Sequence, residues 1–96
     1  TEQVHYFFHK DKIVWLRISE GKKYSIDYTL EQLDELLDPK SFFRINRKYI
    51  IGYNSFSKVT NFTNSRLKIA LNWNENGEDI IVSRERVNKF KSWLDG

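Results

Sequence analysis

The residues whose types and spacing favour binding chemistry lie near the middle of the chain, in the stretch 41–52. Its apolar members have the bulk to be buried, whereas the three cations Arg44, Arg47 and Lys48 cannot be buried without partners. This contrast predicts a short cationic loop that is anchored on both sides. Such a loop suits an anionic partner, because little freedom remains to be lost on binding. The same residues also fit a solvated loop between two core strands.

Two other basic pairs stand out from their surroundings. Arg84 and Arg86 follow Ser83 at the predicted start of a helix, where the helix dipole disfavours cations and a neighbouring glutamate offsets them only in part. Their placement against local preference invites a functional explanation, although two solvated arginines on a surface turn are an alternative. Lys22 and Lys23 form the other pair, at the tip of a predicted hairpin.

Composition restricts the class of protein. The chain has 96 residues, of which 40% are hydrophobic and 30% are charged, which indicates one soluble domain with a core. Because there is no cysteine, disulfides, thiolate metal sites and cysteine nucleophiles are excluded. His5 and His9 lie roughly 13 Å apart along an extended strand, too far to share one ion. With no phosphate-binding loop or nucleophile motif either, we expect no metal, no cofactor and no enzymatic activity.

The distribution of charge adds a preference for polyanions. Residues 1–39 hold five Lys/Arg against eight Asp/Glu, which gives −3, while residues 40–96 hold eleven against five, which gives +6. This asymmetry favours attraction to nucleic acid or to an anionic membrane surface. No apolar run approaches the roughly 20 residues that span a bilayer, and no leader pattern is present. We therefore expect a cytoplasmic domain, and the start at Thr1 favours excision from a longer protein.

Strand patterns dominate the chain that must position these cations. β-Branched and aromatic residues recur in short runs that are separated by turn residues, including Gly21 and the segment 74–77. Tyr24, Ile26 and Tyr28 alternate with polar residues, which predicts a strand with one buried face. The predicted strands cover residues 4–9, 13–18, 24–28, 55–61, 66–71 and 79–82.

Two amphipathic helices interrupt the strands. Thr29 with Gln32 three residues later is a capping-box pattern, and the leucines that follow recur at helical spacing. This helix should stop by Asp38, because the residue before a proline is disfavoured in the α region. Its exposed face is acidic, so we assign it to packing. Ser83 is expected to cap the second helix, whose apolar residues keep one side.

The order of these elements resembles the LytTR DNA-binding domain. The resemblance covers nearly the whole chain and depends on two segments, Phe42-Phe43-Arg44-Ile45-Asn46-Arg47-Lys48-Tyr49-Ile50-Ile51 and Ile81-Val82-Ser83-Arg84. It implies a mainly β domain of elongated antiparallel sheets with two short helices. It also implies sequence-specific binding of duplex DNA by loops inserted into successive major grooves. Such a domain would be the output domain of a bacterial transcription regulator, with a two-component system favoured.

Roles for individual residues follow from the resemblance. Arg47 and Arg84 are the expected base-reading residues, because the planar fork of arginine can donate two hydrogen bonds to guanine. The implied partners are double-stranded DNA, bound by two copies on repeated sites, and an upstream receiver or sensor domain. Asn46, Lys48 and Gly52 depart from the residues that are usual in the family. The expected phosphate or supporting contacts are Arg44, Asn46, Lys48, Lys22, Lys23 and Arg86.

Two other binding functions fit the residues. A β-rich protein-interaction module could use the cationic loops to bind an acidic partner protein. A binder of single-stranded nucleic acid could stack bases on some of the three tryptophans, five tyrosines and seven phenylalanines. A comparison of duplex with single-stranded DNA across a salt series separates these alternatives, because duplex contacts should give a steep slope of log affinity against log salt.

Overall fold

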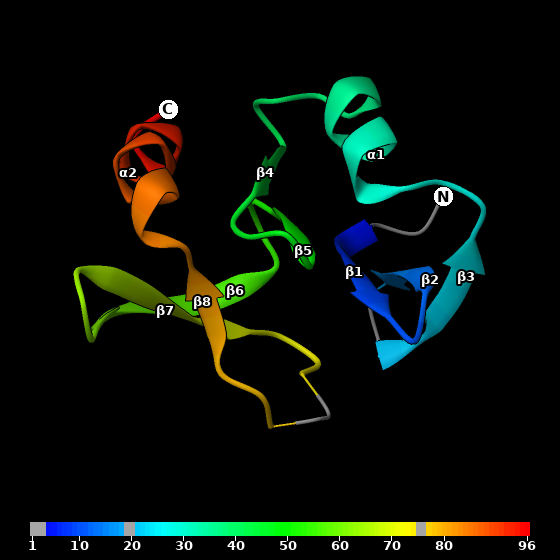
Figure 1. Cartoon of the computed structure of the whole chain (residues 1–96), viewed down its shortest axis with the longest axis horizontal. Helices are drawn as coiled ribbons and strands as arrows, with labels where there is room; N and C mark the ends of the chain where they lie inside the picture. The colour runs from blue at the N-terminus through cyan, green and yellow to red at the C-terminus, as the bar shows by residue number, and fades with distance from the viewer. Residues whose placement is uncertain (1–3, 19–20, 75–76) are drawn as a thin grey trace.

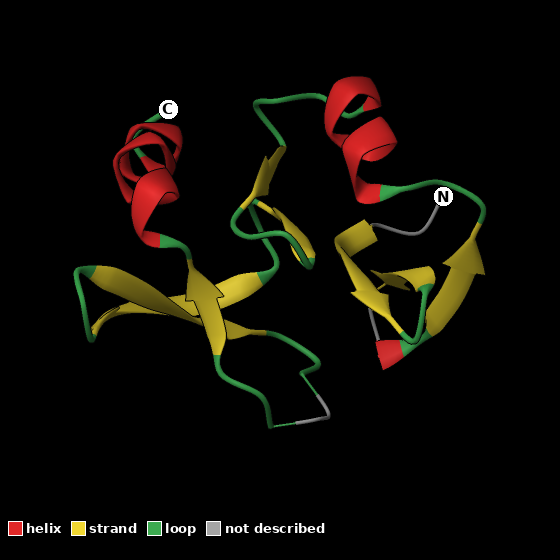
Figure 2. Cartoon of the chain, in the orientation of Figure 1, coloured by secondary structure: helices red, strands yellow, loops and turns green. Residues whose placement is uncertain are grey.

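The computed structural model describes residues 4–18, 21–74 and 77–96 of the chain. The described residues form mainly antiparallel β-strands with the α-helices α1 and α2 and the 3₁₀ helix η2 (Figures 1 and 2), which confirms the predicted fold class. The elements are β1 (Val4–Lys10), β2 (Ile13–Ile18), β3 (Lys23–Ile26), α1 (Leu30–Leu36), β4 (Phe42–Arg44), β5 (Tyr49–Gly52), β6 (Phe56–Phe62), β7 (Arg66–Leu71), β8 (Ile80–Val82), η2 (Arg84–Arg86) and α2 (Val87–Leu94).

The strands form two sheets. Five strands pair in the order β3-β2-β1-β5-β4, and three pair in the order β6-β7-β8. β1 is the central strand of the larger sheet, because it pairs with β2 on one side and with β5 on the other, where Phe8 lies opposite Tyr49. This pairing brings the start of β5, and the loop before it, next to the end of β1.

Both faces of the larger sheet are buried at its strands β1 and β5. Tyr6 and Phe8 of β1 face a core shared with the three-stranded sheet and α2, whereas Phe7 between them faces α1. Ile51 and Ile50 of β5 divide in the same way. Successive side chains of a strand point to opposite faces, so a sheet covered on both sides has continuous apolar runs instead of alternation.

The outline of the domain is nearly equal in all directions. Its principal extents are 32 × 28 × 26 Å, so the domain as a whole is not elongated. The reason is that the two sheets do not follow each other end to end. Ile69 and Ile80 of the smaller sheet pack into one core with Tyr6 and Phe8 of the larger sheet. The apolar inner faces therefore hold the sheets against each other.

The first helix begins as the sequence predicts. The Thr29 side chain accepts a hydrogen bond from the Gln32 backbone N–H at 3.0 Å, and the Gln32 side chain accepts one from the Thr29 N–H at 2.9 Å. The helix ends at Leu36, before Asp38, and Leu37 is already extended. No helix in the part of the chain that the structure describes is long and apolar enough to cross a membrane.

The predicted buried face of the third strand is wrong for two of its three residues. The Tyr24 and Tyr28 side chains are 52% and 51% exposed, and only Ile26 packs against the core. β3 is the edge strand of the sheet. The seven-residue helix α1 packs against β1 and β5 and buries Leu30 and Leu33, and of Tyr24, Ile26 and Tyr28 only Ile26 joins that cluster.

Two hairpin turns bear on the positions of the basic residues. Between β1 and β2 the two turn residues Asp11 and Lys12 both have positive φ, 54° and 65°. This is the pair of conformations that a two-residue type I′ turn requires. Gly21, before β3, has φ 79°, as its predicted role requires. The turn predicted at 74–77 falls partly on residues 75–76, which lie outside the described residues.

Replacing Gly52 by alanine is expected to destabilise the fold by about 1–3 kcal/mol, the usual effect of overfilling a packed site. A Cβ atom at Gly52 would lie 2.7 Å from the His5 carbonyl oxygen and 3.3 Å from the Phe42 ring, and the backbone oxygen belongs to a strand that cannot move freely. Denaturant unfolding measures the effect. Ser57→Ala on the exposed face of β6 is the control, and equal unfolding midpoints for the two variants would contradict the prediction.

Candidate nucleic-acid interface

The β4–β5 loop is held in shape by the side chain of Asn46. Its Oδ1 accepts hydrogen bonds from the backbone N–H groups of Lys48 at 2.7 Å and Tyr49 at 2.9 Å. Its Nδ2 donates to the backbone carbonyl of Ile81 in β8 at 2.7 Å. One side chain therefore closes the loop and fastens it to a strand of the other sheet. Asn46 was expected to support DNA contact, and the structure shows how it supports the loop.

The guanidinium of Arg44 is engaged inside the protein. Its Nε donates to the Asn46 carbonyl at 3.1 Å, and its terminal nitrogen donates to the Arg47 carbonyl at 3.1 Å and to Glu31 Oε2 at 3.0 Å. Only 10% of the Arg44 side chain is exposed. Arg44 thus does not project from the loop with the other two cations, because the loop's own carbonyls and the acidic face of α1 satisfy its donors.

Two titratable groups at this end of the sheet have shifted pKa values. A backbone hydrogen bond at Glu31, followed by the hydrogen bond from Arg44, lowers the pKa of the Glu31 carboxyl. Burial, followed by the charge of Glu78, raises the pKa of the Tyr49 hydroxyl. Both shifts leave the groups in their ordinary neutral-pH states, so Glu31 is an anion that can pair with Arg44 and Tyr49 is uncharged.

The second predicted contact point is fastened to the first. The Ile45 carbonyl accepts hydrogen bonds from the Ser83 N–H at 2.9 Å and from the Ser83 hydroxyl at 3.3 Å. The Arg86 guanidinium donates to the Arg44 carbonyl at 3.3 Å. The expectation that the Ser83 hydroxyl caps the second helix is therefore wrong, because the hydroxyl bonds to the β4–β5 loop instead. Ile45 itself is fully buried below the junction.

Three of the predicted cations project from this junction. Arg47 and Lys48 in the β4–β5 loop and Arg84 in the Ser83–Arg86 turn are exposed. Among the described residues, no carboxylate lies within ion-pair distance of any of them. Their charges are available to a ligand, while the backbone that carries them is fixed by the hydrogen bonds of Asn46 and Ser83.

The β6–β7 hairpin, which the sequence did not indicate as part of the site, lies beside Arg84. Asn64, Arg66, Asn46 and Arg84 all line one shallow depression of about 490 Å³. Arg66 is partly fixed within its own turn, since it donates to the Thr63 carbonyl at 3.0 Å and to the Thr63 hydroxyl at 2.9 Å. The register of β7 with β8, in which Leu67 lies opposite Val82, places the β6–β7 turn next to Ser83. A local sequence pattern does not show this register, so the sequence did not indicate the hairpin.

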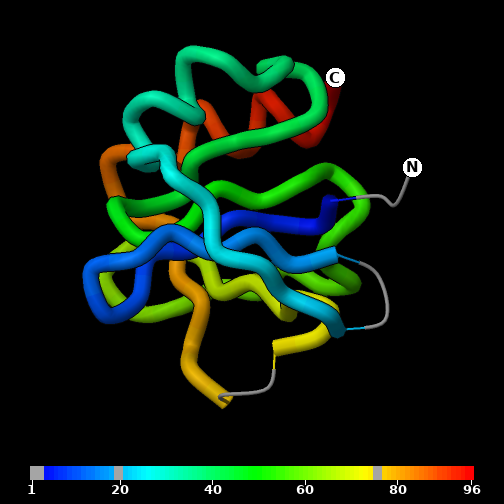
Figure 3. Tube along the Cα trace, turned by 90° about the vertical axis from the view of Figure 1, so that its right-hand side faces the viewer, coloured from blue at the N-terminus to red at the C-terminus, as the bar shows by residue number. Residues whose placement is uncertain are grey.

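Lys22 and Lys23 lie at the other end of the larger sheet. Lys23 pairs opposite Arg17, near the end of β2, whereas the β1–β2 turn lies at the start of β2 and next to the β4–β5 loop. Figure 3 shows the β1–β2 turn, the β4–β5 loop and the start of η2 on one side of the molecule, with the end of β2 and the start of β3 on the opposite side. The Lys23 Nζ lies 5.0 Å from the centre of the Trp15 ring.

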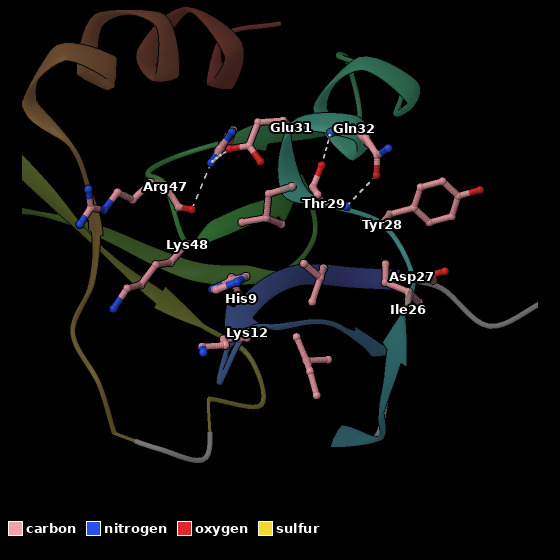
Figure 4. Close-up of a pocket in the computed structure, with 14 residues that line it drawn as sticks. His9, Lys12, Ile26, Asp27, Tyr28, Thr29, Glu31, Gln32, Arg47 and Lys48 are labelled. Atoms are coloured by element: carbon pink, nitrogen blue, oxygen red, sulfur yellow. Dashed lines mark hydrogen bonds and ion pairs between the residues drawn. The ribbon is translucent and has the colours of Figure 1, made fainter.

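An open groove of about 810 Å³ lies between the start of α1, the end of β1 with the start of β2, and the β4–β5 loop (Figure 4). Lys12, Arg47 and Lys48 lie toward one end of the groove, and Asp27 and Tyr28 lie toward the other. The cationic end adjoins the junction of the two loops. Lys12 was part of a predicted turn but was not among the predicted site residues.

Comparisons with known proteins agree on one family. The family model described as the LytTr DNA-binding domain matches residues 1–95. Among solved structures, the chain is similar to a LytTr DNA-binding domain from Bacillus cereus, described as part of a methyl-accepting/DNA response regulator. The two share 27% sequence identity and superpose with a TM-score of 0.79, over 97% of this chain and 82% of the other. No curated protein matches the chain.

Proposed function

The chain belongs to the LytTR family of DNA-binding domains, and we propose that it reads duplex DNA through the β4–β5 loop and the Ser83–Arg86 turn. Because the two loops are hydrogen-bonded to each other, in this proposal they act as one contact surface at neighbouring positions of the duplex and recognise a specific sequence. The observation that carries it is the junction of the two loops. Their backbones are hydrogen-bonded to each other, while Arg47, Lys48 and Arg84 point outward without internal partners among the described residues.

The dimensions of the domain support contact over about one turn of DNA. The β6–β7 hairpin, the β4–β5 loop and β1 follow one another along the long axis in Figure 1. That axis measures 32 Å, which is close to the roughly 34 Å of one helical turn. Basic residues along this side can therefore reach more than one groove without a change in the fold.

The residues divide into three roles in this proposal. Arg47 and Arg84 read bases, because an exposed guanidinium on a fixed backbone can donate two hydrogen bonds to guanine. Lys48 binds phosphate, where a single ammonium adds affinity without reading sequence. Arg44 and Asn46 position the loop, and Arg86 adds a hydrogen bond between the two loops. Lys22 and Lys23 lie outside this contact side and are not included.

Selection of bound sequences from a pool of random duplexes tests the proposal. Enrichment of a motif, with weaker binding to the same sequence as a single strand, is the expected result. A pool that returns no motif would contradict sequence-specific reading. Stronger binding to single strands would favour the stacking alternative, and binding that does not change with salt would favour an acidic protein partner.

The regulatory setting is proposed from the family and from the related structure. The Bacillus cereus domain is described as part of a response regulator. We propose the same arrangement here, with residues 1–96 as one cytoplasmic output domain that follows a receiver or sensor and controls transcription. Two copies would bind repeated sites, because a domain of this size covers only about one turn of the duplex.

Replacing Lys48 by alanine is expected to weaken binding to the selected duplex and to random duplex by the same factor. The reason is that a phosphate contact is present on every sequence. The slope of log affinity against log salt should become shallower by about 0.9, the value for one released counterion. Titrations of both duplexes over a salt series measure this. A loss confined to the selected sequence would instead make Lys48 a base-reading residue.

A further inference from the structure

We propose that the outer edge of β3 binds a second copy of this chain, which pairs its own β3 with that edge in antiparallel orientation and joins the two larger sheets. Both partners are protein, so the proposal does not rest on the proposed function. It assigns Lys23, which lies outside the DNA-contact side, to an interface between two copies.

The outer edge of β3 is open. β3 is the last strand of the larger sheet, and among the described residues no strand pairs with its outer side. Figure 3 views the domain from this side, and β3 lies in front of the other strands. Lys23, Tyr24 and Ser25 are exposed, and residues 22–28 contain no proline. An exposed, regular edge strand is a template for pairing with another strand.

The backbone of β3 shows which of its groups face outward. The Ile18 N–H donates to the Lys22 carbonyl at 2.9 Å, so the backbone groups of Lys22 are turned toward β2. In an antiparallel pair the hydrogen-bonded residues alternate along the strand, so Tyr24 is turned toward β2 in the same way. The N–H and C=O groups of Lys23 and Ser25 therefore point away from the sheet.

Pairing of two copies about Ser25 uses these outward groups. The two Ser25 residues then form a hydrogen-bonded pair on the two-fold axis. The same register places Lys23 of each copy opposite Asp27 of the other, and Tyr24 opposite Ile26. An opposite-charge pair and an aromatic pair with a β-branched residue are both favourable across strands. The sequence of this edge is therefore complementary to itself.

The charges favour this register over its neighbours. Among the described residues, neither Lys23 nor Asp27 lies within ion-pair distance of an opposite charge, and the Lys23 Nζ lies 5.0 Å from the centre of the Trp15 ring. Pairing about Lys23 would place the two lysines opposite each other, which is unfavourable. Pairing about Ser25 is the register that joins Lys23 to Asp27. A second copy of the chain thus supplies the charge that each of these residues lacks.

The pairing leaves the proposed DNA-contact side of each copy free. Val14, near the start of β2, lies opposite Ile26, so the end of β3 is at the same end of the sheet as the β4–β5 loop. In an antiparallel pair the end of one β3 lies beside the start of the other. The two β4–β5 loops therefore lie at opposite ends of the joined sheet. This contact differs from that of two copies side by side on one duplex.

Ser25→Cys tests the two-fold register, because the chain has no cysteine of its own. Residues of a hydrogen-bonded pair have Cα atoms about 5.5 Å apart, which a disulfide can span. In a glutathione redox buffer the variant should form a disulfide-linked dimer at least about tenfold faster than Ser57→Cys, because pairing raises the local concentration of the thiol. Ser57, exposed on β6, is the matched control. Equal rates for the two variants would overturn the proposal.

Charge reversal tests the pair of Lys23 with Asp27. Either Lys23→Asp or Asp27→Lys, added to Ser25→Cys, places like charges across the two strands and should slow the formation of the disulfide to the rate of Ser57→Cys. The variant that carries both reversals restores opposite charges in the same register and should recover most of the rate. Circular dichroism verifies that each variant is folded. If the double reversal is as slow as the single reversals, the proposed pairing is wrong.

Sedimentation equilibrium of the wild type without DNA tests the contact in the absence of a cross-link. Protein concentrations up to about 1 mM are needed, because a contact of one short strand belongs to the weak class of interfaces. The dimer fraction should rise with protein concentration and fall with salt, which screens the ion pair. Lys23→Asp should stay monomeric. A wild type that is monomeric throughout would overturn the proposal, while binding of duplex by that monomer would leave the proposed function intact.

Discussion

Replacing Asn46 by alanine is expected to destabilise the domain and to weaken DNA binding more than the loss of any single cation. The change leaves the N–H groups of Lys48 and Tyr49 and the carbonyl of Ile81 without their partner. A buried polar group without a partner costs about 1–3 kcal/mol, and two of these three bonds are partly buried. Denaturant unfolding should show a loss of at least about 2 kcal/mol.

Binding should suffer along with stability, because Asn46 fixes the backbone that carries Arg47 and Lys48. The loss of stability and the loss of affinity are separated by titrating the variant at denaturant concentrations below its unfolding midpoint, where it is folded. Under these conditions the folded variant should bind the selected duplex at least about tenfold more weakly than the wild type, because its loop is no longer ordered. Asn88→Ala, at an exposed position of α2, is the control. Wild-type affinity in folded Asn46→Ala would show that other bonds are sufficient to shape the loop.

Asn46→Asp tests the two halves of the side chain. A carboxylate can still accept from the N–H groups of Lys48 and Tyr49, but it cannot donate to the Ile81 carbonyl and would face that oxygen. The aspartate variant should therefore keep the turn of the loop and lose its attachment to β8. A free energy of unfolding between those of the wild type and Asn46→Ala would show that the two accepted hydrogen bonds stabilise the domain more than the repulsion from the Ile81 carbonyl destabilises it.

Local sequence patterns predicted the secondary structure well. The capping box of Thr29 and Gln32 and the strand runs depend on neighbours within a few residues, so the chemistry that fixes them is readable along the chain. Ser83 shows the limit of this reading. Its type and place are those of a helix cap, but the Ile45 carbonyl, distant in sequence, is within reach of its hydroxyl and N–H.

The surroundings of charged residues depend on the sheet order, which no local sequence pattern shows. Arg17 in β2 is a charged residue in an apolar run, but it is 2% exposed, and its guanidinium donates to the Gly21 carbonyl at 2.7 Å and to the Tyr6 hydroxyl at 3.3 Å. Arg44 is engaged in the same way. The sequence indicated where cations gather, but only the tertiary structure shows which donors are already satisfied.

The sheet order also decides which hairpin turn lies beside the β4–β5 loop. The sequence predicted the β1–β2 and β2–β3 hairpins equally well and gave weight to the lysine pair in the second. β5 pairs with β1, and this long-range pairing places the β1–β2 turn beside the β4–β5 loop. It leaves the β2–β3 turn at the opposite end of the larger sheet. Without that pairing, the sequence does not show whether Lys12 or Lys22 lies beside the β4–β5 loop.

Replacing Arg84 by alanine is expected to reduce the preference for the selected duplex over random duplex by about 5- to 150-fold. This range corresponds to the roughly 1–3 kcal/mol that a bidentate contact to a base contributes to discrimination. Random binding should fall much less, by the contribution of one charge. Competition titrations with the two duplexes measure the ratio directly, and Lys48→Ala, which should leave the ratio unchanged, is the matched control.

Arg84→Lys distinguishes base recognition from electrostatic attraction to phosphate, because it keeps the positive charge and removes the planar guanidinium. Affinity for random duplex should stay near that of the wild type, while the preference for the selected sequence should fall nearly as far as in Arg84→Ala. Full retention of the preference would show that position 84 acts only through its charge. The Ser83–Ile45 hydrogen bonds lie in the backbone and the neighbouring side chain, so either replacement leaves the junction of the two loops in place. A lost preference in these variants can then be attributed to the guanidinium and not to a displaced loop.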